Sequence, residues 1–492
     1  MGHLIGIDVG SQSVKAVLVS PEGTTLALAS SPCSMLHASP GWADQAPAQW
    51  ETGIRSVVRA VLREAAVPGA EVTHLGLACQ VDGVVAMDDA GRPLRDAIIW
   101  LDRRASSESR ALADAMGPDR IFDITGLNPD ASHVAPKIMW LRAHEPELYR
   151  STAMLAPVAG YLVGWLTGSA AQDHANASST LLYDVRRRDW SDAMIEATGI
   201  EPSLLCPIRA SHEVVGELRR DVADALGLSV ACQVVVGTGD DHAASLGAGA
   251  AAPGIITDVT GTAEPVTAVA DELVFDDEHV VETHAHAVDG ELLVENPGFV
   301  SGGSTLWLSK NVLGMPQGQV FECAATAPAG SDGVVFLPTL SGSTAPRWND
   351  EIRGVFAGLS LNHDRSHLAR AVLEGCAYAL RDIVARLEAL GLGGSEIRVV
   401  GGGARSELWL QIKADVTGRP VRPVLSPEPT ALGAAMLAGI AGGSFAHAAE
   451  AVERVVALRP EPLLPRPEVG ARYETDYRRY RELFDAVEGC CR

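Results

Sequence analysis

The chain opens with two short apolar stretches that flank a turn of small residues. Residues 4–9 are apolar except for Asp8, residues 10–13 read Gly-Ser-Gln-Ser, and residues 14–19 resume the apolar pattern. This pattern predicts a β-hairpin. Near the middle of the chain, residues 255–262 repeat the plan, with an apolar strand that carries Asp258 and then a small-residue turn. Two halves that begin alike indicate a duplicated architecture.

Helical and strand patterns alternate after each hairpin. Residues 47–66 and 366–389 place apolar side chains at three- and four-residue spacing, which predicts helices. Short apolar stretches at 72–78, 233–236 and 397–400 are typical of buried strands. The alternation predicts an α/β protein.

The length of the chain predicts two domains. Its 492 residues exceed the roughly 250–300 at which a single core stops growing. The clearest change in composition is the small-residue stretch 247–254, just before the second hairpin, and we place the boundary there. The segment from Arg466 onward is charged and aromatic and is predicted to be a surface helix without chemistry of its own.

Charge and hydropathy narrow the choice of partner. With 39 basic and 62 acidic residues the formal net charge is -23, which disfavours binding to nucleic acid or anionic lipid and favours a small ligand. The longest apolar run, 155–166, is well short of the roughly 20 residues that span a bilayer, so no membrane anchor is expected. The first residues carry no secretory signal pattern, which predicts a cytoplasmic protein.

Three turns are candidates for ligand binding. A tight turn of small residues, as in each hairpin, can direct several backbone N–H groups at one anion such as a phosphate, although the first turn alone is equally well explained as an ordinary hairpin. Asp8 is costly to bury unless it is paired or faces a metal, so a magnesium role is predicted. The triplet 401–403 is all glycine and follows an apolar strand, which allows a base or ribose to approach the backbone; in isolation such a triplet is more often a simple turn.

Asp240 and Asp241 are the best candidates for catalysis. They stand between a strand and a helix pattern and are followed by His242. One aspartate could simply cap the helix, but a pair of carboxylates in glycine-rich surroundings suits a general base for a hydroxyl. His284 and His286 share one face of a strand, and without a third ligand nearby we expect packed side chains rather than a metal site. Neither a P-loop nor a dinucleotide-binding glycine motif is present in the sequence.

Together these segments resemble the FGGY carbohydrate kinases of the actin and hexokinase superfamily, over nearly the whole chain. Residues 354–359 (GVFAGL) and 367–374 (HLARAVLE) match the C-terminal signature of the family, and 132–141 (SHVAPKIMWL) is a near match to the N-terminal one. Residues 401–409 (GGGARSELW) look like its adenosine loop, with 430–435 as the segment that follows. Within the family the likeness is closest to xylulokinases.

The resemblance implies two duplicated ribonuclease H-like domains with a cleft between them. Residues 1–248 would hold the sugar site, the first phosphate loop and the catalytic aspartate, residues 253–441 the second phosphate loop and the adenosine site, and 442–492 a helical tail. The implied activity is phosphorylation of a sugar hydroxyl by ATP and Mg²⁺, with D-xylulose as the default substrate and with a homodimer as the assembly.

The resemblance also assigns roles to single residues. Asp240 would be the catalytic base, and Asp8 and Asp240 would hold the metal. The substrate-binding residues would be Gln80, Val81, Asp82, Asp240 and Asp241. The nucleotide-binding residues would be Gly10, Ser11, Gln12, Ser13, Lys15, Gly261, Thr262, Gly402, Gly403 and Ser406.

Two departures from the family pattern keep other substrates open. Xylulokinases usually carry His and Asn where this chain has Asp82 and Asp241. Both changes add a carboxylate beside the sugar hydroxyls, which favours a kinase for another ketose or for a polyol such as L-xylulose, ribulose, erythritol or glycerol. More distant alternatives are an actin-like ATPase, which lacks the two signatures, and a sugar-sensing regulator, which would need a DNA-binding segment.

Overall fold

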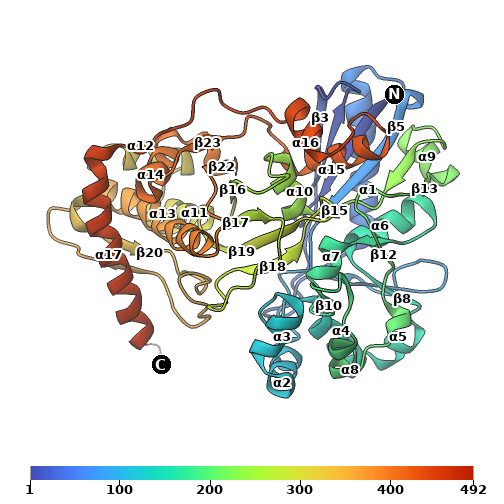
Figure 1. The fold of residues 1–492 in the computed structure, drawn as a ribbon, viewed down its shortest axis with the longest axis horizontal. Coiled ribbons are helices and arrows are strands. Elements are labelled where there is room, and N and C mark those ends of the chain that lie inside the picture. The colour runs from blue at the N-terminus through green and yellow to red at the C-terminus, as the bar shows by residue number, and fades with distance from the viewer. Residues whose placement is uncertain (1, 491–492) are drawn as a thin grey trace.

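The structure is a computed structural model that describes residues 2–490, so the outermost residues of the predicted first domain and tail lie outside it. Two lobes lie side by side, each built on a mixed β-sheet with helices on both faces (Figure 1). We call the lobe around β1 the first lobe and the lobe around β16 the second. In residues 2–490 no helix is long and apolar enough to cross a membrane.

The sheet of the first lobe has the order β13-β14-β5-β1-β2-β3, with β15 beside β5. Its strands are β1 (His3–Val9), β2 (Ser13–Val19), β3 (Thr25–Pro32), β5 (Val72–Cys79), β13 (Val214–Glu217), β14 (Gln233–Val235) and β15 (Thr238–Gly239). The predicted first hairpin is confirmed, because β1 and β2 pair antiparallel and set Asp8 opposite Lys15. β5 then lies parallel to β1 on its other side.

The sheet of the second lobe has the order β18-β19-β17-β16-β22-β23. Its strands are β16 (Ile255–Thr260), β17 (Ala263–Ala270), β18 (Glu282–Ala285), β19 (Leu292–Val300), β22 (Glu396–Gly401) and β23 (Val421–Pro423). Here too an antiparallel hairpin, β16 and β17, is followed by a parallel strand on its other side, β22. The shared plan confirms the predicted duplicated α/β architecture.

Amphipathic helices complete each core. α1 (Pro47–Ala65) begins with proline and buries Trp50, Ile54, Val58 and Val61 at three- and four-residue spacing against the first sheet. Other helices that cover this sheet are α6 (Val158–Thr167) and α9 (Arg220–Leu226). The second lobe is covered by α11 (Gly302–Trp307), α12 (Gln317–Ala324), α13 (Arg365–Ala389) and α14 (Glu407–Thr417).

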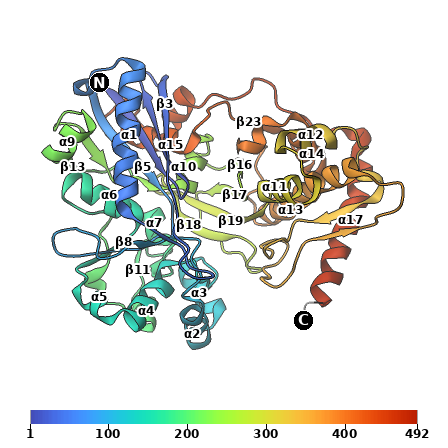
Figure 2. The same cartoon turned by 180° about the vertical axis from the view of Figure 1, so that it is seen from behind.

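A helical insertion extends the first lobe below its sheet (Figure 2). It contains α2 (Ser106–Met116), α3 (Pro118–Thr125), α4 (Val134–His144), α5 (Pro146–Ser151), α7 (His174–Ser178) and α8 (Asp192–Thr198). Short two-stranded ladders lie outside the two main sheets: β4 (Asp44–Gln45) with β7 (Ala97–Ile98), β6 (Val85–Met87) with β8 (Met154–Ala156), β9 (Gln172–Asp173) with β12 (Ile208–Arg209), β10 (Tyr183–Asp184) with β11 (Asp189–Trp190), and β20 (Val335–Leu337) with β21 (Val355–Ala357).

The chain passes between the lobes along two crossing helices. α10 (Asp240–Gly247) leads towards the second lobe, and α15 (Pro429–Ala441) returns and packs on β1 and β5 of the first. The backbones nearly touch, because a Cβ on Gly433 of α15 would lie 2.1 Å from the carbonyl oxygen of Ala243 on α10. α16 (Ala448–Val455) then stays on the first lobe.

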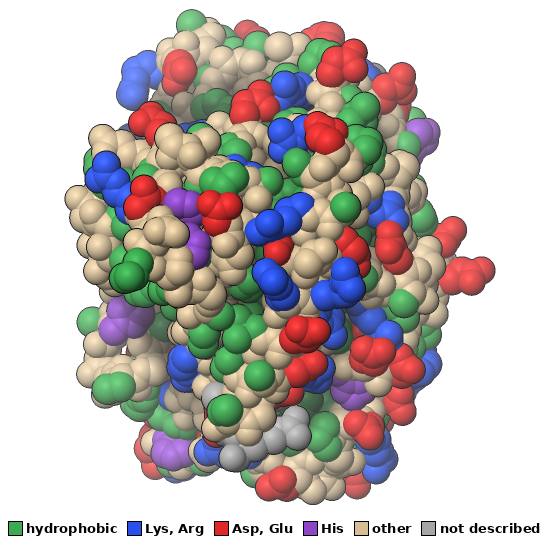
Figure 3. All heavy atoms as spheres, turned by 90° about the vertical axis from the view of Figure 1, so that its left-hand side faces the viewer, with side chains coloured by type: hydrophobic (Ala, Val, Ile, Leu, Met, Phe, Trp, Pro, Cys, Tyr) green, Lys and Arg blue, Asp and Glu red, His purple; other side chains and the backbone are tan. Residues whose placement is uncertain are grey.

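The final helix, α17 (Pro467–Cys490), lies along the second lobe. Its outer face mixes acidic and basic side chains (Figure 3), as expected for a surface helix. Its inner face is part of the core, because Tyr473, Tyr480 and Phe484 are fully buried. The tail therefore contributes to the stability of the second lobe.

Candidate active site

Asp240 and Asp241 stand in the first turn of α10, directly after β15. The N-cap residue of this helix is Gly239, so neither aspartate caps it. Asp240 Oδ1 accepts a hydrogen bond of 3.2 Å from the backbone N–H of Asp241. Asp241 Oδ1 in turn lies 2.6 Å from His242 Nδ1. The two neighbouring carboxylates therefore have different partners.

These different surroundings give the two carboxyl groups different pKa values. Burial, the charge of Asp241 and the charge of Asp8 raise the pKa of Asp240 to about 8. Burial acts in the same direction on Asp241, but the charge and hydrogen bond of His242 outweigh it and hold that pKa at about 2. A pair of carboxylates with opposite shifts can divide roles, one moving a proton and the other staying ionised.

The loop after β5 brings Gln80, Val81 and Asp82 to the same place. Val81 packs against Gly239, where an added Cβ would lie 2.5 Å from a methyl carbon of Val81. Gln80 is buried, and its Nε2 donates to Gln45 Oε1 at 2.9 Å. The five predicted substrate residues therefore come from two segments, one directly after β5 and one directly after its neighbour β15.

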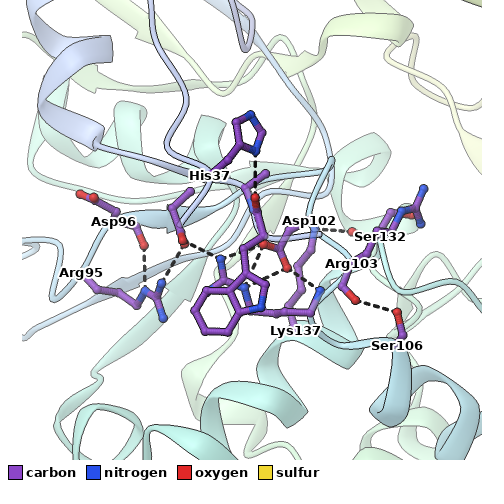
Figure 4. A network of polar contacts seen from close by, with 12 residues as sticks. His37, Arg95, Asp96, Asp102, Arg103, Ser106, Ser132 and Lys137 are labelled. Carbon is purple, nitrogen blue, oxygen red and sulfur yellow. Dashed lines mark hydrogen bonds and ion pairs between the residues drawn. The ribbon is translucent and has the colours of Figure 1, made fainter. Parts of the chain in front are cut away.

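Asp82 is held by two basic residues of the helical insertion. Its φ of 57° is unusual for a residue with a side chain. Lys137 Nζ donates to the Asp82 carbonyl oxygen at 2.6 Å, and His133 Nδ1 lies 3.3 Å from Asp82 Oδ2. Figure 4 shows Lys137 in one polar network with Asp102 and Ser132. Burial lowers the pKa of His133, but the charge of Asp82 outweighs this and raises it to about 9.

Sequence reasoning missed two carboxylates that the second lobe supplies. Glu282 on β18 and Glu295 on β19 face each other in the antiparallel register. Burial raises the pKa of Glu282 to about 7, and burial with the charges of Asp241, Glu282 and Asp240 raises that of Glu295 far above its usual range. The available signal was an acidic residue in each of two segments that the structure shows as strands, but which charges would lie beside it could not be inferred from the sequence.

His284 and His286 are buried, as predicted for packed side chains. Their rings lie 5.6 and 6.4 Å from the ring of His242, measured between centroids. Burial and the nearby His242 charge lower both pKa values to about 3, so both are neutral. They place two uncharged rings beside the His242 ring that contacts Asp241.

The first hairpin turn sets Asp8 and Lys15 beside the returning chain. The turn closes with a bond of 3.1 Å from the Gly10 N–H to the Ser13 carbonyl oxygen. Lys15 Nζ lies 3.7 Å from Asp8 Oδ2 and 2.9 Å from Glu428 Oε2, just before α15. Burial raises the pKa of Asp8 to about 6 despite the attraction of Lys15.

A cavity of about 840 Å³ opens between the lobes beside Lys15. Lys15 and Ala244 line it from the first lobe, and Gly401, Gly402 and Glu428 are among the residues from the later part of the chain. Its size and glycine backbone suit a nucleotide.

The other predicted nucleotide residues are not among the described residues that line this cavity. Gly403 is buried against Thr260, and the Ser406 hydroxyl accepts the Trp409 N–H at 3.3 Å as the N-cap of α14. The two hairpin turns, Gly10 to Ser13 and Gly261 with Thr262, are also not among the lining residues that the structure describes.

The charges around Asp8 and Asp240 show whether these two residues could hold Mg²⁺. Within residues 2–490 no group of three or more His, Cys, Asp or Glu side chains has the arrangement of a metal site. Asp8 nevertheless raises the pKa of Asp240, so the two carboxylates lie within electrostatic reach. A divalent cation would offset this repulsion, and bound phosphates and water would complete its ligands.

Comparisons with known proteins match the chain over both lobes. Residues 3–247 match the N-terminal domain of the FGGY family of carbohydrate kinases, and residues 258–442 match its C-terminal domain. A xylulose kinase of Escherichia coli is 32% identical over 490 residues, which cover 98% of this chain and 99% of the relative. A glycerol kinase of Thermococcus gammatolerans is 31% identical over 447 residues, 89% of each chain. The solved xylulose kinase of Rhodospirillum rubrum has a TM-score of 0.91 at 29% identity and covers 99% of both chains.

Proposed function

The chain belongs to the FGGY family of carbohydrate kinases, and from this premise we propose that it phosphorylates D-xylulose on a terminal hydroxyl, with Asp240 as the general base. The kinase uses ATP and acts on a small sugar or polyol. The observation that supports the choice of base is the raised pKa of Asp240, beside an Asp241 that stays ionised. We also propose the domain limits 1–248 and 253–441 and a tail at 442–492, a homodimer by resemblance to the family, and a cytoplasmic location because the first residues carry no secretory signal pattern.

In the proposed reaction the substrate lies among Gln80, Val81, Asp82 and Asp241, with its reactive hydroxyl at Asp240. Asp240 accepts the hydroxyl proton as the oxygen attacks the terminal phosphorus of ATP, and the bond from that phosphorus to the oxygen bridging it to ADP breaks, so that ADP leaves. Lys15 and the two hairpin turns bind the phosphates, and Mg²⁺, held by Asp8 and Asp240, would neutralise their charge. Most of the rate gain in such a transfer comes from positioning and from excluding water.

A coupled assay for ADP release tests this proposal. D-Xylulose, other ketopentoses, polyols and an aldonate are offered with Mg·ATP to the wild type, to Asp240→Asn and to Asp221→Asn. Asp221 is an exposed control on α9. We expect xylulose-dependent turnover that falls by about 10²- to 10⁴-fold in Asp240→Asn and is unchanged in Asp221→Asn. Full turnover in Asp240→Asn would exclude Asp240 as the base.

A polyol is the second candidate substrate, and Asp82 and Asp241 favour it. Carboxylates accept hydrogen bonds from hydroxyl groups and cannot donate to a ketone oxygen. A linear polyol offers a hydroxyl donor at every carbon. Turnover with a polyol that exceeds turnover with every ketose in the same assay would replace xylulose with this class.

A further inference from the structure

Three charged side chains lie buried beneath the turn of the second hairpin. Asp258 on β16 and Glu264 on β17 are 0% exposed, and Lys413 on α14 is 1% exposed. Lys413 Nζ is 2.6 Å from Asp258 Oδ2 and 3.0 Å from Glu264 Oε1. One ammonium group therefore ties together the two strands that flank Gly261 and Thr262.

Lys413 also reaches the turn itself. Its Nζ donates to Thr260 Oγ1 at 2.5 Å, and the Thr260 hydroxyl donates to Asp258 Oδ1 at 2.8 Å. Because an ammonium group can only donate, this direction of the Thr260 hydroxyl is the one that satisfies both partners. The last residue of β16 is thereby fixed in a single rotamer.

Thr260 joins this cluster to the glycine triplet at the nucleotide cavity. In the parallel register of β16 and β22 it stands opposite Gly401. A Cβ on Gly401 would lie 2.7 Å from the Thr260 carbonyl oxygen, and one on Gly403 would lie 2.4 Å from Thr260 Cγ2. The glycine triplet therefore rests directly on Thr260.

The opposite side of the turn is held by α11. The N–H groups of Gly302 and Gly303 donate to the carbonyl oxygens of Gly261 and Thr262, each at 3.0 Å. The Ser301 hydroxyl donates to Glu264, which brings the same buried cluster into this contact. The turn is clamped from both sides, and Lys413 lies at the centre of the support.

We propose that Lys413 is a positioning residue for nucleotide binding, because through Thr260 it sets the second hairpin turn and the glycine triplet at the distance that ATP requires. A buried ion pair adds little net stability compared with apolar side chains of the same volume, so a geometric role accounts better for a lysine at this position. The inference rests on the proposed role of Gly261 and Thr262 in binding phosphate.

The test compares Thr260→Val with Thr257→Val. Thr257 is buried on the same strand, and its hydroxyl has no hydrogen-bond partner in the described part of the chain, so it is a matched control. Dissociation constants for Mg·ADP are measured by titration calorimetry, and Michaelis constants for ATP and for the sugar are measured in the coupled assay. For Thr260→Val we expect about tenfold weaker ADP binding, a matching rise in KM for ATP and no change in KM for the sugar.

A second variant tests the lysine directly. Lys413→Met, with and without Thr260→Val, gives a double-mutant cycle on ADP binding. If Lys413 acts through Thr260, the double variant binds ADP no more weakly than Lys413→Met alone. Fully additive losses of ADP affinity would overturn the proposal. So would ADP binding in Thr260→Val that equals ADP binding in Thr257→Val. This second comparison does not depend on whether Lys413→Met folds. Absence of sugar-dependent turnover in the wild type would instead count against the proposed function, because ADP binding is measured without a sugar.

Discussion

Asp240 and Asp241 show how adjacent residues of one type acquire different chemistry. The sequence predicts a catalytic pair from their place between a strand and a helix, but it cannot say which carboxylate holds a proton. That difference comes from His242, whose ring turns to Asp241, and from Asp8, which approaches Asp240 from another strand. These residues become neighbours of the two aspartates only when the chain folds.

The pH dependence of catalysis is predicted from the same contacts. A base must be deprotonated, so kcat/KM should rise with pH as Asp240 ionises; burial and the charges of Asp241 and Asp8 raise its pKa to about 8 without the metal, and Mg²⁺ held beside it would bring the apparent pKa below that value. Because the charge of Asp241 helps to raise this value, Asp241→Asn should shift the rise to lower pH by about one unit. The measurement is a kcat/KM profile from pH 5.5 to pH 9.5 on the substrate found above.

The control for this profile is Asp221→Asn, which lies on the surface and should leave the apparent pKa unchanged. An apparent pKa that stays in place in Asp241→Asn would show that the titrating group is not Asp240, or that Asp241 carries no charge beside it.

At the scale of elements, local pattern predicts the hairpins, helix α1, helix α13 and strand β22 to within a few residues. Their signals are short-range: alternation, three- and four-residue spacing, and glycine at turns. The supports of the site escape such reasoning. Lys137, Lys413, Glu282 and Glu295 are charged residues buried inside helices or strands, and only the tertiary structure shows which charges they meet.

The crossing of α10 and α15 predicts a strict requirement for glycine. At Gly433 an added methyl group would lie 2.1 Å from a backbone oxygen of the other helix, which cannot move without separating the helices. Gly433→Ala should lower the free energy of unfolding by about 1–3 kcal/mol, measured by urea denaturation.

Gly470→Ala in α17 is the matched comparison, because apart from its chain neighbours and the helix's own backbone no atom lies within 4 Å of the added methyl group. Alanine favours a helix over glycine, so this variant should be as stable as the wild type or up to about 1 kcal/mol more stable. Equal effects at the two positions would contradict the close crossing.

At the scale of the molecule, β18 fastens the second lobe to the first. The Thr283 N–H donates to the Gly126 carbonyl oxygen at 2.9 Å, and the Ala285 N–H donates to Ser178 Oγ at 3.1 Å. The Asn128 N–H donates to Glu282 Oε1 at 2.8 Å. The nucleotide cavity lies elsewhere along the boundary between the lobes. Hydrogen bonds therefore join the lobes at β18, while at the cavity the lobes leave space between them.

This asymmetry predicts where binding will slow hydrogen exchange. Mg·ADP should protect segments 401–405 and 425–428, which include lining residues of the cavity, by more than tenfold. The amides of Thr283 and Ala285 should change little, because their bonds exist before binding. Mass spectrometry of exchanged peptides measures both, with Mg²⁺ alone as the control. Equal protection of both regions would mean that the lobes also part at β18.

The return of α15 to the first lobe also sets an order of events during synthesis. A Cβ on Gly6 of β1 would lie 1.9 Å from the Ala431 carbonyl oxygen, so the chain's opening strand rests on a helix near its end. While the ribosome makes the second lobe, one face of the first sheet has no cover and stays open to chaperones or to misassociation. The first lobe to be translated is thus completed only after most of the second has emerged.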